Sequence, residues 1–143
     1  MISNKCKYAL RAILFLAVES NETKKIRISE LAEELKMPTP YLGKILQELV
    51  PKSIISSIKG PRGGFYLTKK NQQAPLIKII EAIDGLAYFE KCGLGLEDCS
   101  DSHPCPIHED FKKSRDHLKT VFTNKTIREL ASEIIANELI LVS

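Results

Sequence analysis

The sequence lacks the features that mark most enzymes, membrane proteins and exported proteins. Its 143 residues show no paired catalytic carboxylates, no phosphate-binding glycine loop followed by Lys-Ser or Lys-Thr, and no nucleophile–base signature. No apolar run is long enough to span a bilayer, and no signal-peptide pattern opens the chain. We therefore expect a cytoplasmic protein that is not an enzyme and is not a membrane protein.

Cysteine is scarce, and its four residues are not spaced for common structural sites. The C-x2-C pairs of zinc sites and the ferredoxin spacings are absent, and without an export signal no disulfide framework is expected. Three cysteines, Cys92, Cys99 and Cys105, lie in the aperiodic stretch 86–106, and His108 follows them. Thiolates and an imidazole suit an iron–sulfur cluster or zinc, so this spacing alone predicts a soft-metal or redox site.

Acidic residues lie among these cysteines. We expect Glu97, Asp98 and Asp101 to raise the pKa values of the neighbouring thiols when no metal is bound. Such a shift would disfavour a free, reactive thiol switch. The remaining cysteine, Cys6, is expected to be an ordinary, partly buried thiol.

Charge is divided unevenly along the chain, although the net charge is only +3. Residues 1–70 hold 13 Lys and Arg against 6 Asp and Glu, whereas residues 71–143 hold 8 against 12. The basic first half suits contact with phosphate groups, while the acidic second half would be a poor nucleic-acid surface.

Two short helices across a tight break are predicted within residues 28–49. Ser29 can cap the first helix, and Lys36-Met37-Pro38 ends it. Thr39 and Pro40 can begin the second as its cap and first helical residue. The apolar stripe of the second helix consists of Leu42, Ile45, Leu46 and Leu49. With its polar outer face, this pair matches the helix-turn-helix plan for entering a DNA major groove.

A β-hairpin is predicted directly after the helix pair. Residues 54–58 are rich in β-branched side chains, residues 60–64 are turn material, and residues 65–67 can return as a strand. Lys59 and Arg62 lie near the tip. A basic hairpin after two such helices predicts a mainly α fold with a small β-hairpin wing, that is, a winged helix-turn-helix domain.

Other helices are predicted on both sides of this unit. Residues 5–19 form the first, with Ser3 or Asn4 as its cap, and residues 69–74 are interpreted as a polar linker before a short helix that Pro75 opens. A helix from residue 107 carries a narrow apolar stripe, which is typical of pairing with one partner helix. Thr126 and Glu129 form a capping box for the last helix, with Leu130, Ala131, Ile134 and Ile135 apolar.

These features predict three parts. Residues 1–85 form the winged helix-turn-helix DNA-binding domain, residues 86–106 the cysteine-bearing sensor loop, and residues 107–143 the long dimerisation helix with the C-terminal helix.

The chain resembles the IscR/NsrR-type winged-helix regulators over essentially its full length. The matching motifs are Tyr8-Ala9, Ile28-Ser29-Glu30-Leu31-Ala32, Tyr41-Leu42-x-Lys44-Ile45-Leu46-x-x-Leu49, Gly60-x-x-Gly63-Gly64-Phe65-x-Leu67 and the three-cysteine loop. The resemblance implies a bacterial, homodimeric transcription factor, typically a repressor, whose long helix after the loop crosses its partner.

The resemblance also implies a cofactor. Cys92, Cys99 and Cys105 would ligate an iron–sulfur cluster, [2Fe–2S] in preference to [4Fe–4S], and His108 corresponds to the histidine that completes the [2Fe–2S] site. The state of the cluster, set by redox conditions, nitric oxide or cluster supply, would set DNA affinity. In some relatives a carboxylate from the partner's first helix is a ligand, but Lys7 occupies that position here and an ammonium group cannot ligate.

Alternatives remain open at this point. Some relatives keep the fold without the cluster and act as thiol sensors or through a protein partner. An iron–sulfur electron carrier that does not bind DNA is less favoured, as is a structural zinc loop.

For a DNA-binding dimer, we expect two copies of residues 39–49 in successive major grooves of a pseudo-palindromic operator on double-stranded DNA. The residues expected to contact DNA are Ser29, Thr39, Tyr41, Lys44, Gln47, Lys52, Lys59, Arg62 and Gly63.

Overall fold

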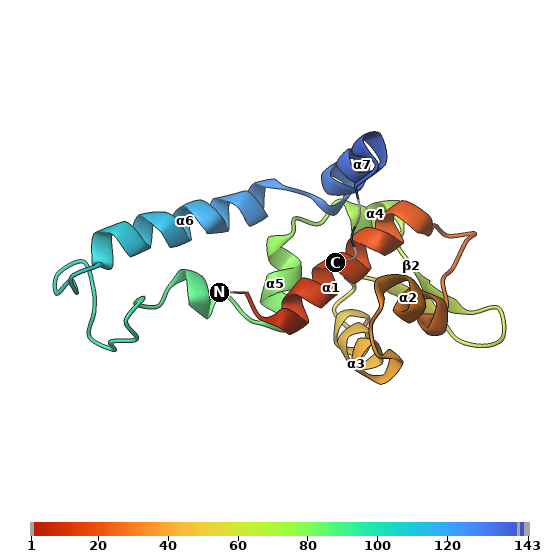
Figure 1. The fold of residues 1–143 in the computed structure, drawn as a ribbon, viewed down its shortest axis with the longest axis horizontal. Coiled ribbons are helices and arrows are strands. Elements are labelled where there is room, and N and C mark those ends of the chain that lie inside the picture. The colour runs from red at the N-terminus through yellow and green to blue at the C-terminus, as the bar shows by residue number, and fades with distance from the viewer. Residues whose placement is uncertain (1, 140, 142–143) are drawn as a thin grey trace.

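Helix α1 (Asn4–Glu19) forms the centre of the molecule because one face of it is almost wholly apolar (Figure 1). Its buried residues include Ala9, Ile13 and Leu16, and the Ser3 hydroxyl caps it by accepting from the Cys6 N–H at 3.0 Å. This is a computed structural model of the chain, and it describes residues 2–139 and 141. The predicted first helix and its cap are confirmed.

Helices α2 (Ile28–Leu35) and α3 (Thr39–Leu49) form the predicted helix-turn-helix. Lys36 ends α2 in a left-handed conformation with φ of 53°, and the stripe of α3 (Leu42, Ile45, Leu46 and Leu49) is fully buried. Both predicted caps are off by one or two residues. Arg27 and Pro38 hold the N-cap positions without side-chain hydrogen bonds, so Ser29 and Thr39 already lie inside their helices.

The wing is a short antiparallel hairpin of β1 (Ser56–Ile58) and β2 (Gly64–Tyr66), in which Ser57 pairs with Phe65. Ile26 adds a bridge on the other side of β2, since its N–H and carbonyl both bond to Phe65, at 2.9 and 2.7 Å. The first strand is shorter than predicted because Ile54 and Ile55 are buried in the core and do not pair in the hairpin.

The prediction of a plain linker at residues 69–74 was wrong, because helix α4 (Lys69–Gln72) lies there. Its capping box joins Thr68 and Asn71: the Asn71 N–H donates to the Thr68 hydroxyl at 3.0 Å, and the Thr68 N–H donates to Asn71 Oδ1 at 2.9 Å. The pattern Thr68-x-x-Asn71 was a local signal for this helix, because Thr-x-x-Asn can cap a helix as Thr-x-x-Glu does. Helix α5 (Ile77–Ile83) begins two residues after Pro75.

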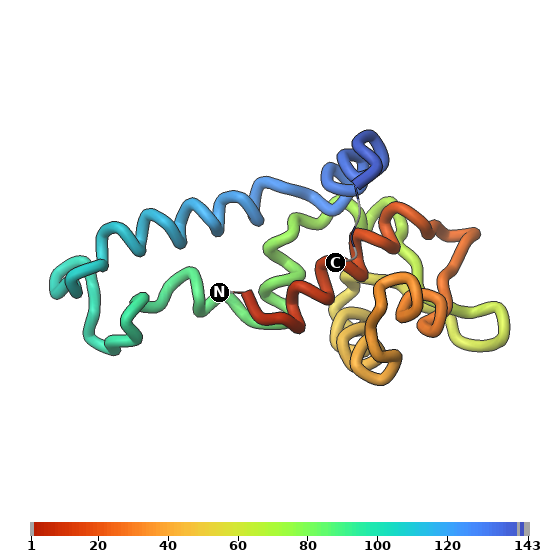
Figure 2. Tube along the Cα trace, viewed as in Figure 1, coloured from red at the N-terminus to blue at the C-terminus, as the bar shows by residue number. Residues whose placement is uncertain are grey.

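Helix α6 (His108–Asn124) extends from the body as a long arm, and none of its residues is buried (Figures 1 and 2). The chain reaches it through the short 3-10 helix η1 (Ala87–Phe89) and the cysteine loop. Helix α7 (Ile127–Asn137) returns to the body with the predicted capping box, and Ile127 and Ala131 are buried in the same core as α1. Ile135, predicted on the apolar face of α7, is 61% exposed because only the face toward α1 is covered.

Within the described residues, no helix is both long and apolar enough to cross a membrane.

Candidate functional site

The outer face of α3 and the wing border one groove. The cavity between them measures about 650 Å³, and its lining includes Ser29, Gln47, Lys59 and Gly63. Four other predicted DNA-contacting residues do not line this cavity but are exposed, namely Thr39, Tyr41, Lys44 and Arg62. The fold therefore brings a helix and a basic hairpin tip to the same side of the domain.

Gly63 fixes the shape of the wing tip by having no side chain. A Cβ at this position would lie 2.0 Å from the carbonyl oxygen of Ile58, on the opposite strand. The Gly63 N–H closes the turn by donating to the Gly60 carbonyl at 2.9 Å. The absence of a side chain thus lets the two strands approach each other at the turn.

Lys52 lies apart from this groove. Its Nζ donates to the carbonyl of Ala82 at 2.6 Å, and its side chain lines a different cavity. The structure thus groups Lys52 with α5 and separates it from the other predicted DNA-contacting residues.

The three loop cysteines converge at the far end of α6. Their Sγ atoms all lie within 4.8 Å of one another, and Cys92 and Cys105 are 3.7 Å apart. The Nδ1 atom of His108 lies 3.1 Å from Cys99 Sγ. Three mutually close thiols with an imidazole beside one of them are a donor set that suits an iron–sulfur cluster, so the residues present fit such a group.

The Asp101 carboxylate orients His108 through the ring nitrogen that does not face Cys99. Asp101 Oδ1 lies 2.9 Å from His108 Nε2, and the same carboxylate accepts from Lys112 Nζ at 2.9 and 3.0 Å. With Nε2 facing this carboxylate, Nδ1 faces the Cys99 thiol. Metal-ligating histidines are commonly held in this manner. The bond to His108, followed by that to Lys112, lowers the pKa of Asp101 to about 2.

The thiol pKa values differ from the expectation based on acidic neighbours. The pKa of Cys92 is lowered to about 7, first by a hydrogen bond from the Leu96 backbone. For Cys99, the backbone of Cys105 lowers the pKa, but burial and the adjacent thiols raise it overall. The prediction failed for Cys92 because Asp101 is engaged with His108 and Lys112, and because turns of the loop aim N–H groups at sulfur.

Other contacts fasten the loop to α6. Arg115 donates to the carbonyl of Lys91, next to Cys92, at 2.5 Å. Gly93 lies so close to Phe111 that an added Cβ would approach the ring to 2.7 Å. By contrast Cys6 lies elsewhere, fully buried in a cluster with Ile80 and Phe89. Cys6 is therefore more buried than expected and is separate from the loop thiols.

A known protein family matches the chain and agrees with the fold and the cysteine group described above. The model of Rrf2, described as an iron-dependent transcriptional regulator, matches residues 2–133. The chain belongs to the Rrf2 family. It is accordingly a DNA-binding transcriptional regulator with a winged-helix fold, and it is not an enzyme.

Rrf2 relatives cover nearly the whole chain. An HTH-type transcriptional regulator of Aquifex aeolicus is 32% identical over 132 residues, which is 91% of this chain and 90% of the relative. IscR of Pectobacterium atrosepticum is 25% identical over 131 residues, covering 92% and 79%.

Two solved structures share the Rrf2 fold. CymR, the global cysteine regulator of B. subtilis, has a TM-score of 0.75 at 24% identity and covers 93% of this chain and 97% of its own. IscR of T. potens has a TM-score of 0.73 at 18% identity, covering 98% and 92%.

Several residues of this Rrf2 chain that support the two sites were not predicted. Arg27 joins the start of α2 to the wing tip by donating to the carbonyl of Pro61. Tyr8 packs edge-on against Tyr41, with ring centroids 5.6 Å apart. Asp101 lies between two of the predicted ligands in sequence, and that position was the available signal for its role beside His108.

Proposed function

We propose that this Rrf2 protein is a homodimeric, sequence-specific DNA-binding repressor whose affinity for DNA is set by an iron–sulfur cluster. The observation that carries the proposal is the convergence of Cys92, Cys99 and Cys105 beside His108 on an arm separate from the DNA groove. These four residues would hold the cluster, with [2Fe–2S] preferred because an imidazole completes the donor set. When bound, the cluster supplies reversible one-electron chemistry and reactivity toward nitric oxide.

The chain's own residues would transmit the state of this site. Arg115 and the Gly93–Phe111 contact tie the loop to α6. Asp101 of the loop adds contacts to His108 and Lys112 on the same helix. Ligation by residues on both the loop and α6 would therefore stiffen the joint between them. Loss of ligation would release it and bias the dimer toward a second arrangement of its two DNA-binding domains.

The affinity for DNA is expected to depend on Lys44 and Arg62. It should not depend on a lysine on α6. On an operator selected from a pool of double-stranded fragments, Lys44→Ala and Arg62→Ala should each weaken binding by about tenfold, since a base-reading contact is worth about 1–3 kcal/mol. Fluorescence anisotropy at fixed salt measures this. Lys113→Ala, which removes the same charge from exposed α6, is the control. Equal affinity for wild type and both test variants would refute the assignment.

The dimer is expected to form through the narrow stripe of α6. Val121 on this stripe is 40% exposed and belongs to neither apolar cluster of the described residues, whereas Leu118 and Phe122 of the same stripe pack against the body. Val121→Glu should convert the dimer to a monomer in analytical ultracentrifugation, because it would bury an unpaired carboxylate at the contact. Thr120→Glu, on the opposite face of the helix, is the control. A Val121→Glu protein that stays dimeric would place the interface elsewhere.

A second candidate function is direct thiol sensing by the same loop. The 3.7 Å separation of the Cys92 and Cys105 sulfurs is short enough for a small shift to bring them to disulfide distance, about 2.05 Å. A peroxide would take two electrons and two protons from the thiols, leaving a disulfide and water. Iron and sulfide analysis of protein purified without oxygen separates the two functions, because colourless, iron-free protein favours the thiol mechanism.

A further inference from the structure

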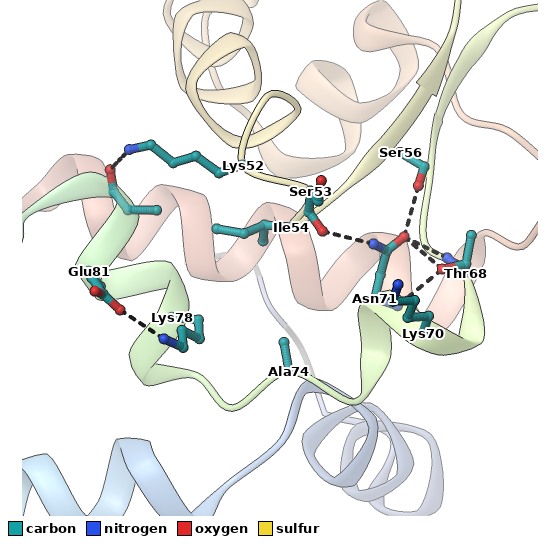
Figure 3. Close-up of a pocket in the computed structure, with 11 residues that line it drawn as sticks. Lys52, Ser53, Ile54, Ser56, Thr68, Lys70, Asn71, Ala74, Lys78 and Glu81 are labelled. Atoms are coloured by element: carbon teal, nitrogen blue, oxygen red, sulfur yellow. Dashed lines mark hydrogen bonds and ion pairs between the residues drawn. The ribbon is translucent and has the colours of Figure 1, made fainter.

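An open cavity of about 600 Å³ lies behind the wing, where four segments meet (Figure 3). They are the turn after α3, the start of β1, helix α4 and helix α5. Ile54, Ala74 and Ala82 provide its apolar part. A cavity of this size is in the range that accommodates small organic ligands and is much larger than an inorganic ion requires.

The polar part of the cavity is basic. Lys52, Lys70 and Lys78 line it together with a single acidic residue, Glu81. Glu81 pairs with Lys78 at 3.3 Å, and Lys52 donates to the Ala82 carbonyl. The ammonium group of Lys70 makes no hydrogen bond or ion pair with any residue that the structure describes, whereas its backbone carbonyl accepts from the Gln73 N–H. The cavity therefore has a surplus of positive charge, with one ammonium group available at its rim.

The wall beside Lys70 is rigid. The Asn71 side chain accepts from the Ser56 hydroxyl at 2.9 Å and donates to the Ser53 carbonyl at 3.1 Å (Figure 3). The same amide oxygen accepts from the Thr68 N–H. Because these bonds join α4, β1 and the turn after α3, the cavity is held open without a ligand.

We propose that this cavity binds a small organic oxyanion, a carboxylate or phosphate ester with a short apolar body, as an effector. The ammonium groups of Lys70 and Lys78 would bind the anionic groups, and Ile54 and Ala82 would contact the apolar body. This site lies outside the proposed cluster and the proposed DNA groove, and it goes beyond the function proposed above.

Strand β1 connects this cavity to the groove between α3 and the wing. Successive residues of a strand face opposite sides, and on β1 Ser56 lines this cavity whereas Ser57 lines the DNA groove. Lys78 and Ala82 belong to α5, which leads into the cysteine loop. A bound anion would therefore link the base of the wing to the helix that precedes the sensor loop.

Titration of the iron-free, DNA-free protein with defined anions tests the proposal. Succinate, citrate and glycerol 3-phosphate are added at constant ionic strength, and amide chemical shifts are followed by NMR. Inorganic phosphate and neutral succinamide serve as comparison ligands. We expect saturable shifts confined to residues 52–56, 68–74 and 78–82 with an organic anion, and weaker or no binding of the comparison ligands. Comparison of succinate and citrate with glycerol 3-phosphate shows whether the ligand is a carboxylate or a phosphate ester.

Neighbouring lysines on α4 provide a matched pair of variants. Lys70→Gln should weaken the binding by about tenfold, because it removes a charge-assisted contact. Lys69→Gln removes the same charge from the same helix, but Lys69 lines a different cavity, so binding should change less than about twofold. Shifts that never saturate, or equal weakening by both variants, would overturn the proposal. Because neither cluster nor DNA is present, failure here leaves the proposed function intact.

Discussion

Replacing Cys105 by serine should abolish the visible absorption of the protein purified without oxygen, together with its bound iron and sulfide. Cys105 is three residues from His108 and its sulfur is the one 3.7 Å from Cys92, so it lies between the loop and the start of α6. A serine hydroxyl stays protonated where a thiolate binds iron, so the ligand set would lose one of its three sulfurs. Cys92→Ser and Cys99→Ser should have the same effect.

The fourth cysteine supplies the matched control for this result. Cys6 is fully buried, and burial, followed by the charge of Asp84, raises its pKa to about 12. Its thiol would not ionise at neutral pH, and it lies among apolar side chains. Cys6→Ala should therefore keep full absorption while losing about 1 kcal/mol of stability for the small cavity it leaves. Cluster loss in Cys6→Ala with retention in Cys105→Ser would invert the assignment of ligands.

Replacing Gly63 by alanine should remove DNA binding more completely than loss of any single wing cation. The added Cβ would lie 2.0 Å from the Ile58 carbonyl oxygen, and both groups are held by the hairpin backbone, so the turn must open. Opening displaces Lys59 and Arg62 together. With about 1–3 kcal/mol for each base-reading contact, affinity should fall by about a hundredfold. Anisotropy with the selected operator measures this, and thermal unfolding shows whether the body of the domain remains folded.

Gly43, within helix α3, is the control for the substitution of Gly63. A Cβ there would approach only the tip of the Ile28 side chain, at 3.2 Å, and this tip can rotate away. Alanine also favours the helix by about 1 kcal/mol over glycine. Gly43→Ala should therefore keep or slightly raise the melting temperature and retain DNA binding. If Gly63→Ala binds as tightly as Gly43→Ala, the wing does not depend on close strand approach.

The sequence predicted the parts of the fold that rest on periodic burial. The stripe of α3 and the capping box of α7 were recognisable because core residues recur every three or four positions and because Thr126 and Glu129 face each other one turn apart. Helix α4 was missed because four residues give no periodicity, and only its cap encoded it. Ile135 was misplaced because a helix packed on one neighbour covers fewer apolar positions than its sequence offers.

The candidate sites were predictable as residue types but not as geometry. Cysteine and histidine pointed to the proposed metal site, yet nothing in the spacing showed that Asp101 would turn toward His108 and Lys112. Lys52 resembled a phosphate contact in sequence, but its direction depends on α5, which is about thirty residues further along the chain. Long-range partners of this kind are set by packing and leave no local pattern.

The attachment of α6 to the body has a mechanical consequence. Backbone bonds hold its root, where the Leu76 N–H donates to the Lys125 carbonyl at 2.9 Å and the Ile127 N–H to the Ala74 carbonyl at 3.0 Å. The cysteine loop lies at the opposite end of this 17-residue helix, about 25 Å away (Figure 1). A lever of this length pivoting at its root converts a tilt of about 5° into a displacement of about 2 Å at the tip. A small rearrangement of the three sulfurs would thus accompany a rotation of α6 about its root. This root lies beside the core that holds helices α2 and α3.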